Sequence, residues 1–231
     1  MALSRYPFRA RYEREARIEG FRLIAGIDEA GRGCLFGPVF AAAAILSEDR
    51  PVRGLRDSKE LDPEYRELLA GRIKERAVAW AVASADAFEI DRVNIYQASR
   101  LAMRRAVERL NPTPDFLLID ALRIDWPAPQ LPLIHGDAIC QSIAAASILA
   151  KTERDACLRK WDEVFPQYGF SRHKGYGTDE HLAALDAHGP TPLHRFSFEP
   201  VRDRSPHALW TGYPRQAELF ENTGEGSPVW P

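Results

Sequence analysis

Four carboxylates in this chain have the types and surroundings expected of a metal-binding catalytic site. Asp28 and Glu29 follow an apolar run that begins at Leu23, Asp120 ends another apolar run, and Asp155 falls in an expected helix. If the four converge, like charges about 4 Å apart repel by roughly 4 kcal/mol at a surface-like dielectric constant. Such a cluster needs raised pKa values or bound cations. Mg²⁺ and Mn²⁺ prefer oxygen ligands, and two such ions can clamp the attacking and leaving oxygens of a phosphodiester.

A glycine-rich segment, Gly31, Arg32 and Gly33, follows the acidic pair. Neighbouring residues on a strand point to opposite faces, so Asp28 and Glu29 can serve one site only where the strand ends and the backbone turns. Residues without a Cβ atom let the backbone approach a ligand closely. Alone, a Gly-Arg-Gly segment is more often a hairpin turn. Directly after an acidic pair, it indicates backbone contact with sugar or phosphate beside a metal.

Apolar runs and capping residues predict an α/β domain with a mixed sheet. Buried apolar runs indicate strands, and a capping side chain followed by a periodic segment indicates a helix start. Strands are expected at 23–28, 39–46, 78–84, 116–120 and 131–135, the first two forming an antiparallel pair. Helices are expected after Asp62-Pro63, Asn94 and Thr178, and over 143–165, where Pro166 ends the helix.

The composition gives no global sign of a nucleic-acid partner. The chain has 231 residues, is 45% hydrophobic and carries a formal net charge of −2. This length suits one generous domain, alone or with a small appendage, and any basic footprint must be local. Two basic clusters qualify, although solvated surface explains the first equally well. They are Arg5, Arg9, Arg11, Arg14, Arg17 and Arg22, and then Arg172, His173 and Lys174.

Cysteine spacing and hydropathy argue against several classes of protein. Cys34, Cys140 and Cys157 are widely separated, which argues against a disulfide framework or a zinc site. No apolar run approaches the roughly 20 residues of a membrane span, and the start of the chain has no signal-peptide pattern. We therefore expect a cytoplasmic protein, and one that acts as a monomer.

Several motifs in a fixed order resemble the ribonuclease HII family, the bacterial type 2 ribonucleases H. The resemblance covers residues 21–201, and the number and length of the motifs make it highly specific. It rests on Gly-Ile-Asp-Glu-Ala-Gly-Arg-Gly at 26–33, Gly-Pro-Val at 37–39, Asp-Ser-Lys at 57–59, Leu-Leu-Ile-Asp at 117–120, Gly-Asp at 136–137, Ser-Ile-Ala-Ala-Ala-Ser-Ile-Leu-Ala-Lys at 142–151, Arg-Asp at 154–155, and His-Lys-Gly-Tyr-Gly-Thr at 173–178.

The resemblance implies an RNase H-like fold, with a mixed central sheet flanked by helices, a small helical C-terminal extension and a flexible tail. We expect an N-terminal arm at 1–20, a catalytic domain at 21–201 and the tail at 202–231. The implied activity is that of a metal-dependent endonuclease, a ribonuclease H. Its substrates would be RNA–DNA hybrids and single ribonucleotides embedded in duplex DNA. Cleavage on the 5′ side of the ribonucleotide would leave a 3′-hydroxyl and a 5′-phosphate.

The same resemblance assigns roles to individual residues. The four carboxylates Asp28, Glu29, Asp120 and Asp155 would bind two Mn²⁺ or Mg²⁺ ions. The ribonucleotide-sensing loop would be Gly31, Arg32 and Gly33, and the junction-sensing tyrosine would be Tyr176. A 2′-hydroxyl, which is both donor and acceptor, is the feature that such groups must recognise. Without the rest of the motif, Tyr176 would read as a packed turn residue. Candidate phosphate contacts are Lys59, Lys151, Arg154 and Lys174. Lys59 and Lys174 are favoured over Arg154, which could equally pair with a neighbouring acid.

The chain departs from the family pattern at four positions. Cys34 stands where proline is usual, which predicts a less rigid loop and a thiol near the metal site. Ala121 replaces a glycine after Asp120 and restricts the backbone there. Glu153 adds an acid two residues before Asp155. His135 stands where lysine is usual, and we interpret it as structural or as a weak backbone contact.

Two alternative functions and one further candidate motif stay open on the sequence alone. Ribonuclease HIII shares the fold but carries an N-terminal substrate-binding domain, for which the acidic pair at residue 28 leaves no room. A binding protein without catalysis is a second alternative, against which all four carboxylates argue. In the tail, Gln216, Leu219 and Phe220 resemble the peptide by which bacterial proteins bind the sliding clamp; a chance match is the stronger explanation of this short motif.

Overall fold

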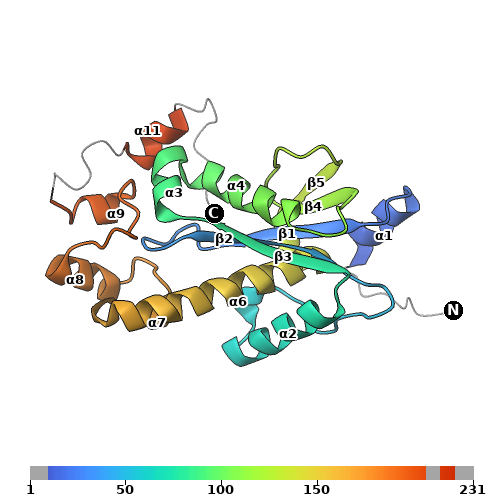
Figure 1. The fold of residues 1–231 in the computed structure, drawn as a ribbon, viewed down its shortest axis with the longest axis horizontal. Coiled ribbons are helices and arrows are strands. Elements are labelled where there is room, and N and C mark those ends of the chain that lie inside the picture. The colour runs from blue at the N-terminus through green and yellow to red at the C-terminus, as the bar shows by residue number, and fades with distance from the viewer. Residues whose placement is uncertain (1–9, 207–213, 222–231) are drawn as a thin grey trace. The chain divides into compact units, whose positions relative to one another are not determined.

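The computed structural model describes residues 10–206 and 214–221 (Figure 1). The basic residues Arg5 and Arg9 and most of the predicted tail therefore lie outside the described residues. In the part of the chain that is described, no helix is long and apolar enough to cross a membrane.

Five strands form one mixed sheet in the order β3-β2-β1-β4-β5. β1 runs antiparallel to β2 and parallel to β4, and β4 runs parallel to β5. The predicted mixed sheet and its antiparallel first pair are confirmed. The strands are β1 (Ile24–Ala30), β2 (Val39–Ile45), β3 (Ala79–Ala85), β4 (Phe116–Asp120) and β5 (Gln130–Leu133).

The helices begin at the caps that the sequence predicts. Asp62 accepts a hydrogen bond from the Tyr65 amide at 2.8 Å, and Asn94 accepts one from the Gln97 amide at 2.9 Å. The helices are α1 (Arg11–Ile18), α2 (Pro63–Arg76), α3 (Ala87–Val93), α4 (Ile95–Glu108), α5 (Gly136–Ile139), α6 (Gln141–Val164), α7 (Phe170–His173), α8 (Asp179–His188), α9 (Glu199–Arg202) and α11 (Gln216–Glu221). Short 3-10 turns span Ser58–Glu60 and Pro166–Tyr168.

The chain divides into two compact units that alternate along the sequence. The first holds the described residues up to Ala30, together with Phe40–Ser84 and Arg100–Glu153. The second holds Gly31–Val39, Ala85–Ser99 and the described residues from Arg154 onward. Each has its own apolar cluster. In the first unit β2, α2 and α6 pack together through alanines and branched residues, and in the second Phe36, Phe170 and Leu185 belong to the cluster.

Small side chains let α6 lie very close to the sheet in the first unit. A Cβ atom added at Gly26 of β1 would lie 2.0 Å from the backbone carbon of Ser142, and 2.3 Å from the backbone nitrogen of Ile143. Glu13 of α1 holds the same end of α6, because its carboxylate accepts hydrogen bonds of 2.8 Å from both the amide and the hydroxyl of Ser142. The start of α6 is thereby fixed against the strand that carries Asp28.

This contact predicts a severe effect of one added methyl group. Gly26→Ala is expected to lower the free energy of unfolding by about 1–3 kcal/mol, because backbone cannot move aside for the new Cβ as a side chain would. Thermal or urea unfolding measures the change. Gly71→Ala in α2 is the matched control, since nothing lies within 4 Å of the added atom. It should stabilise the helix by about 0.5–1 kcal/mol. Equal effects of the two substitutions would contradict the packing argument.

Candidate active site

Two of the predicted carboxylates lie at the same level of the sheet. The parallel register pairs Ile27 of β1 with Ile119 of β4, so Asp28 and Asp120 follow as the next residues of neighbouring strands. Glu29 comes directly after Asp28 within β1. The fold thus brings three of the four predicted carboxylates to one edge of the first unit.

Burial and mutual repulsion make this group electrostatically strained. Burial, and then the charges of Glu29 and Asp120, raise the pKa of Asp28 well above its usual range. A hydrogen bond from the Ser147 side chain opposes that rise, and the Glu29 amide donates to the Asp28 carboxylate at 2.7 Å. Burial and the Glu29 charge likewise raise the pKa of Asp120 to about 6, although the Gly136 amide donates to its Oδ1 atom at 2.7 Å.

The structure adds a fourth acid to this group that the sequence analysis did not assign. Burial, and then the charge of Asp57, raise the pKa of Asp137, and the Asp137 charge in turn raises the pKa of Asp120. Lys59 lowers the pKa of both Asp120 and Asp137, so its ammonium group acts on the acidic cluster. The Gly-Asp pair at 136–137 was part of the family motif, which was the available signal for Asp137.

The donor set has the chemistry of a hard-cation site. All of the groups named are carboxylates, and oxygen ligands are those that Mg²⁺ and Mn²⁺ prefer. A bound cation would also offset the repulsion that raises these pKa values. Within residues 10–206 and 214–221, however, no three Asp, Glu, His or Cys side chains are placed to hold a metal ion together. The carboxylates are therefore of the right chemical type for Mg²⁺ or Mn²⁺, but their side chains would have to move closer together to bind one ion.

The glycine loop, residues 31–33, belongs to the second unit and is held by a buried arginine. Arg195 is fully buried, and its guanidinium donates to the carbonyl oxygens of Gly31 and Arg32 at 2.7 Å each and of Gly37 at 3.0 Å. Gly31 has a φ of +95°, and a Cβ atom there would lie 2.0 Å from Nε of Arg154. Glycine is required at this position for both reasons.

The tyrosine turn, residues 174–177, lies beside the glycine loop in the same unit. Cys34 and Tyr176 form an antiparallel bridge, and the Leu35 amide donates to the Gly175 carbonyl at 2.8 Å. Tyr176 is exposed at the surface, although part of its side chain is buried. Burial and then the Cys34 thiol raise its pKa, and the Asp155 carboxylate also contributes. The second unit thus brings the fourth predicted carboxylate, Asp155, within electrostatic range of Tyr176.

Two predicted phosphate contacts behave differently in the structure. The Lys174 ammonium donates to the Ser171 carbonyl at 2.6 Å, and Lys174 itself has a left-handed φ of 55°. Arg154 is 1% exposed, and its Nη1 atom donates to the Lys174 carbonyl at 2.9 Å. Arg154 therefore supports the tyrosine turn from within.

The departures from the family pattern have local explanations. Ala121 has a φ of 50°, a conformation that favours glycine, so the restriction expected there is real. Glu153 forms an ion pair with Lys74 at 2.5 Å, which neutralises the additional acid. Cys34 is fully buried, and its sulfur lies 3.6 Å from the Lys174 carbonyl oxygen. His135 has a left-handed φ of 54° before α5, consistent with a structural role.

Comparison with known proteins gives one consistent family. The family model described as ribonuclease HII matches residues 25–201. A curated relative named ribonuclease HII, from Solibacter usitatus, is 62% identical over 215 residues, covering 93% of each chain.

Solved structures have the same fold. Ribonuclease H2 from Pyrococcus horikoshii matches with a TM-score of 0.68 and 25% identity, over 79% of this chain and 97% of that one. The complex of PCNA with RNase HII from Archaeoglobus fulgidus matches with a TM-score of 0.64 and 26% identity, over 75% and 92%. Bst RNase HIII in complex with Mn²⁺ has a TM-score of 0.61 at 20% identity, over 81% and 70%, and shares the fold.

The raised pKa of Asp120 predicts that the folded protein becomes less stable when this side chain loses its proton. A folded-state pKa of about 6, above the usual 3.8, means that the folded protein binds more protons between these values. This contribution to stability is therefore complete at low pH and is lost as the pH rises through about 6. Asp120→Asn removes the charge while keeping the Oδ1 acceptor for Gly136. Without divalent ions at pH 7, it should stabilise the protein by about 1–2 kcal/mol.

Thermal unfolding between pH 4 and pH 7 in the presence of a chelator measures this effect. Asp49→Asn, at an exposed aspartate in the same unit, is the control and should change stability little. An Asp120→Asn variant that loses stability at pH 7, or that shows the same pH dependence as the unmodified protein, would refute the electrostatic strain.

Proposed function

Because the chain belongs to the ribonuclease HII family, and is thus an endoribonuclease that acts on RNA–DNA hybrids, we propose that it cleaves the phosphodiester with the help of two divalent cations. Asp28, Glu29, Asp120 and Asp155 are the proposed ligands. The observation that carries the proposal is the register that brings Asp28, Glu29 and Asp120 together at the ends of β1 and β4, where burial and mutual repulsion raise the pKa values of Asp28 and Asp120. The Mn²⁺ in the RNase HIII neighbour agrees with this choice of ion.

In the proposed reaction the acidic side chains place the cations, and no side-chain nucleophile is needed. When bound, two ions supply the Lewis acidity that helps water attack and the 3′-oxygen leave. Ser147 and the Glu29 amide hold Asp28, and the Gly136 amide holds Asp120, so both carboxylates keep a fixed orientation. Lys59, whose charge acts on this cluster, is the proposed phosphate contact.

We further propose that the second unit recognises the ribonucleotide, so that single ribonucleotides in duplex DNA are substrates as well as hybrids. The glycine loop would contact the 2′-hydroxyl through its backbone, and the ring of Tyr176 would pack on the neighbouring sugar. Two features support these roles. Arg195 holds the loop carbonyl groups from inside, and Tyr176 is 44% exposed although its backbone is bonded on both sides. Lys174 is a further proposed substrate contact at this turn.

A duplex with one embedded ribonucleotide tests the activity. Cleavage on its 5′ side, with a 3′-hydroxyl and a 5′-phosphate, is expected with Mn²⁺ or Mg²⁺. Asp120→Asn should reduce cleavage at least about 100-fold, since metal-ion catalysis supplies several kcal/mol, while binding of the duplex is retained. Asp49→Asn is the control. Binding without cleavage by the unmodified protein under either metal would overturn the proposal.

The sliding-clamp prediction meets a competing role for the same segment. In α11 the Gln216 side chain accepts from the Ile95 amide at 2.8 Å and donates to the Ser197 hydroxyl at 2.6 Å. Leu219 is buried, and its carbonyl oxygen accepts from Asn94 at 3.4 Å. The side chain of Phe220 lies outside the described residues. Clamp binding through this peptide would therefore require α11 to leave its contacts with the start of α4.

A binding measurement separates the two roles of α11. If the peptide is the clamp-binding element, replacing Leu219 and Phe220 together with alanine is expected to abolish binding of the full chain to a bacterial sliding clamp, as measured by surface plasmon resonance. Unchanged affinity would eliminate the clamp proposal and leave α11 as a structural element of the second unit.

A further inference from the structure

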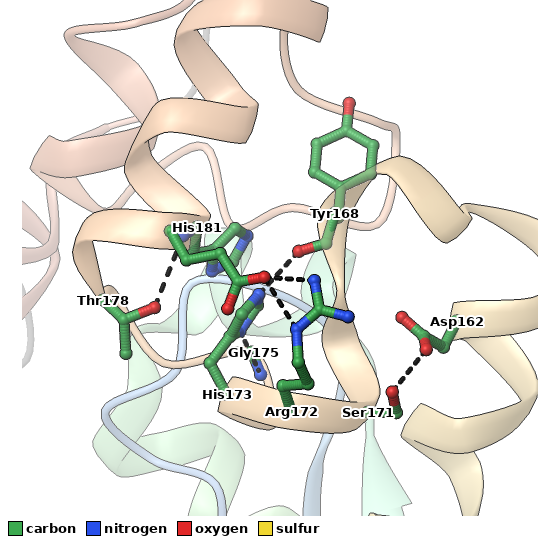
Figure 2. Close-up of polar contacts among 9 residues, drawn as sticks. Asp162, Tyr168, Ser171, Arg172, His173, Gly175, Thr178 and His181 are labelled. Carbon is green, nitrogen blue, oxygen red and sulfur yellow. Dashed lines mark hydrogen bonds and ion pairs between the residues drawn. The ribbon is translucent and has the colours of Figure 1, made fainter.

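Three buried histidines of the second unit have no part in the proposed chemistry. His173, His181 and His194 are each at most 9% exposed. The rings of His173 and His181 stack with centroids 4.5 Å apart, and those of His181 and His194 lie 5.3 Å apart. Figure 2 shows His173 and His181 side by side, with Gly175 of the tyrosine turn next to His173 and Thr178 next to His181. The histidines thus adjoin a segment that is proposed to read the substrate.

The hydrogen bonds of these rings fix a single direction of donation. The Thr191 amide donates to Nδ1 of His194 at 2.9 Å, so Nδ1 carries no proton and the ring proton is on Nε2. That Nε2 faces Nε2 of His181 at 3.1 Å, which must therefore be the acceptor. The proton of His181 is then on Nδ1, which donates to the Tyr176 carbonyl at 2.9 Å. The Thr191 amide thus determines which nitrogen of His181 carries the proton, and so which one donates to the Tyr176 carbonyl.

This chain of hydrogen bonds requires both rings to be neutral. A second proton on His181 would lie on Nε2 and face the N–H of His194 across 3.1 Å, and a second proton on His194 would lie on Nδ1 and face the Thr191 amide across 2.9 Å. Burial lowers the pKa of His181 to about 4 and that of His194 to about 3, so both are neutral near pH 7. His173 lowers the pKa of His181 further, whereas the carboxylate of Glu180, which is paired with Arg172, raises it. His173 is held separately by the Tyr168 carbonyl and the Gly175 amide.

The two ends of this series of hydrogen bonds lie at the two segments that are proposed to read the substrate. Phe36 and His194 form an antiparallel bridge, and the next residue, Arg195, donates to two carbonyl groups of the glycine loop and to that of Gly37. At the other end, Nδ1 of His181 donates to the backbone carbonyl of Tyr176, an exposed residue of the tyrosine turn. The segment that fixes the loop is therefore joined to the turn by side-chain hydrogen bonds that pass through the interior.

We propose that Thr191, His194 and His181 form a positioning relay that sets the Tyr176 backbone relative to the glycine loop and so determines preference for a DNA–RNA junction. The inference rests on the proposed role of Tyr176 in the function above. His181 and His194 touch neither substrate nor metal in this account. They act through Tyr176, so their loss should alter the choice between substrates more than the capacity for hydrolysis.

Substitutions at His181 test the relay. His181→Leu removes the donor to Tyr176, whereas the amide of His181→Asn can take the place of Nδ1–H. The measured quantity is kcat/KM for a duplex with one ribonucleotide, divided by kcat/KM for an RNA–DNA hybrid. His181→Leu should lower this ratio roughly 3- to 10-fold, the range for one lost hydrogen bond. His181→Asn should restore most of it. His188→Leu, at an exposed histidine of the same helix, should leave it unchanged.

Tyr176→Ala separates this inference from the proposed function. If Tyr176→Ala leaves the ratio unchanged, the role of Tyr176 fails, and the relay fails with it. If Tyr176→Ala lowers the ratio but His181→Leu leaves it unchanged, the relay alone is overturned. The same holds if His181→Leu lowers kcat/KM for both substrates equally.

A second measurement does not depend on the stability of any variant. ¹⁵N NMR of the histidine rings in the unmodified protein should show His181 protonated at Nδ1 and His194 at Nε2. The opposite tautomer at either ring would contradict the relay.

Discussion

Repulsion among buried and half-buried carboxylates at the ends of β1 and β4 is the constraint on which the first unit depends. The parallel register places Asp28 and Asp120 at one level, and Glu29 adds a third charge, so the folded chain must hold groups that repel one another. It does so with short hydrogen bonds from the Glu29 and Gly136 amides. The close contact of Gly26 with α6 fixes the helix that carries Ser147, another partner of Asp28. The stability lost to this repulsion is what a bound cation would recover.

In the second unit, neutral and cationic side chains donate hydrogen bonds that hold the backbone of the glycine loop and the tyrosine turn in place. A loop and a turn with the proposed role of reading a substrate must keep a defined shape while remaining accessible. Arg195 and Arg154 bind carbonyl groups of these segments from the interior, and His181 binds another. Buried donors used in this way fix the backbone without occupying its outer face. The charge of Arg195 is tolerated because its guanidinium meets three carbonyl dipoles, although burial still lowers its pKa to about 10.

Local signals in the sequence predicted the elements and the principal acids, whereas contacts between distant segments could not be foreseen. The caps Asp62 and Asn94 and the end of β4 at Asp120 follow from short-range rules and are confirmed, whereas β1 continues two residues beyond the predicted end at Asp28, to Ala30. Arg195 bonds to Gly31 across 164 residues, and no periodicity or spacing marks such a pair. The sequence did not predict the histidine relay for the same reason, since nothing in a sequence distinguishes a buried histidine from an exposed one. Arg154 was weighed as a phosphate contact or ion-pair partner, but only the packed turn reveals its bond to a carbonyl.

The central claim is that the acidic cluster holds divalent cations in place of protons, and proton release on metal binding tests it most directly. Calorimetric titration of Mn²⁺ at pH 6, in buffers of different ionisation enthalpy, gives the number of protons released per metal ion bound. Because the pKa of Asp120 is about 6 and that of Asp28 is raised, binding should release a fraction of a proton or more at pH 6 and less at pH 8. Saturable binding without proton release at pH 6, or no binding at all, would contradict the account.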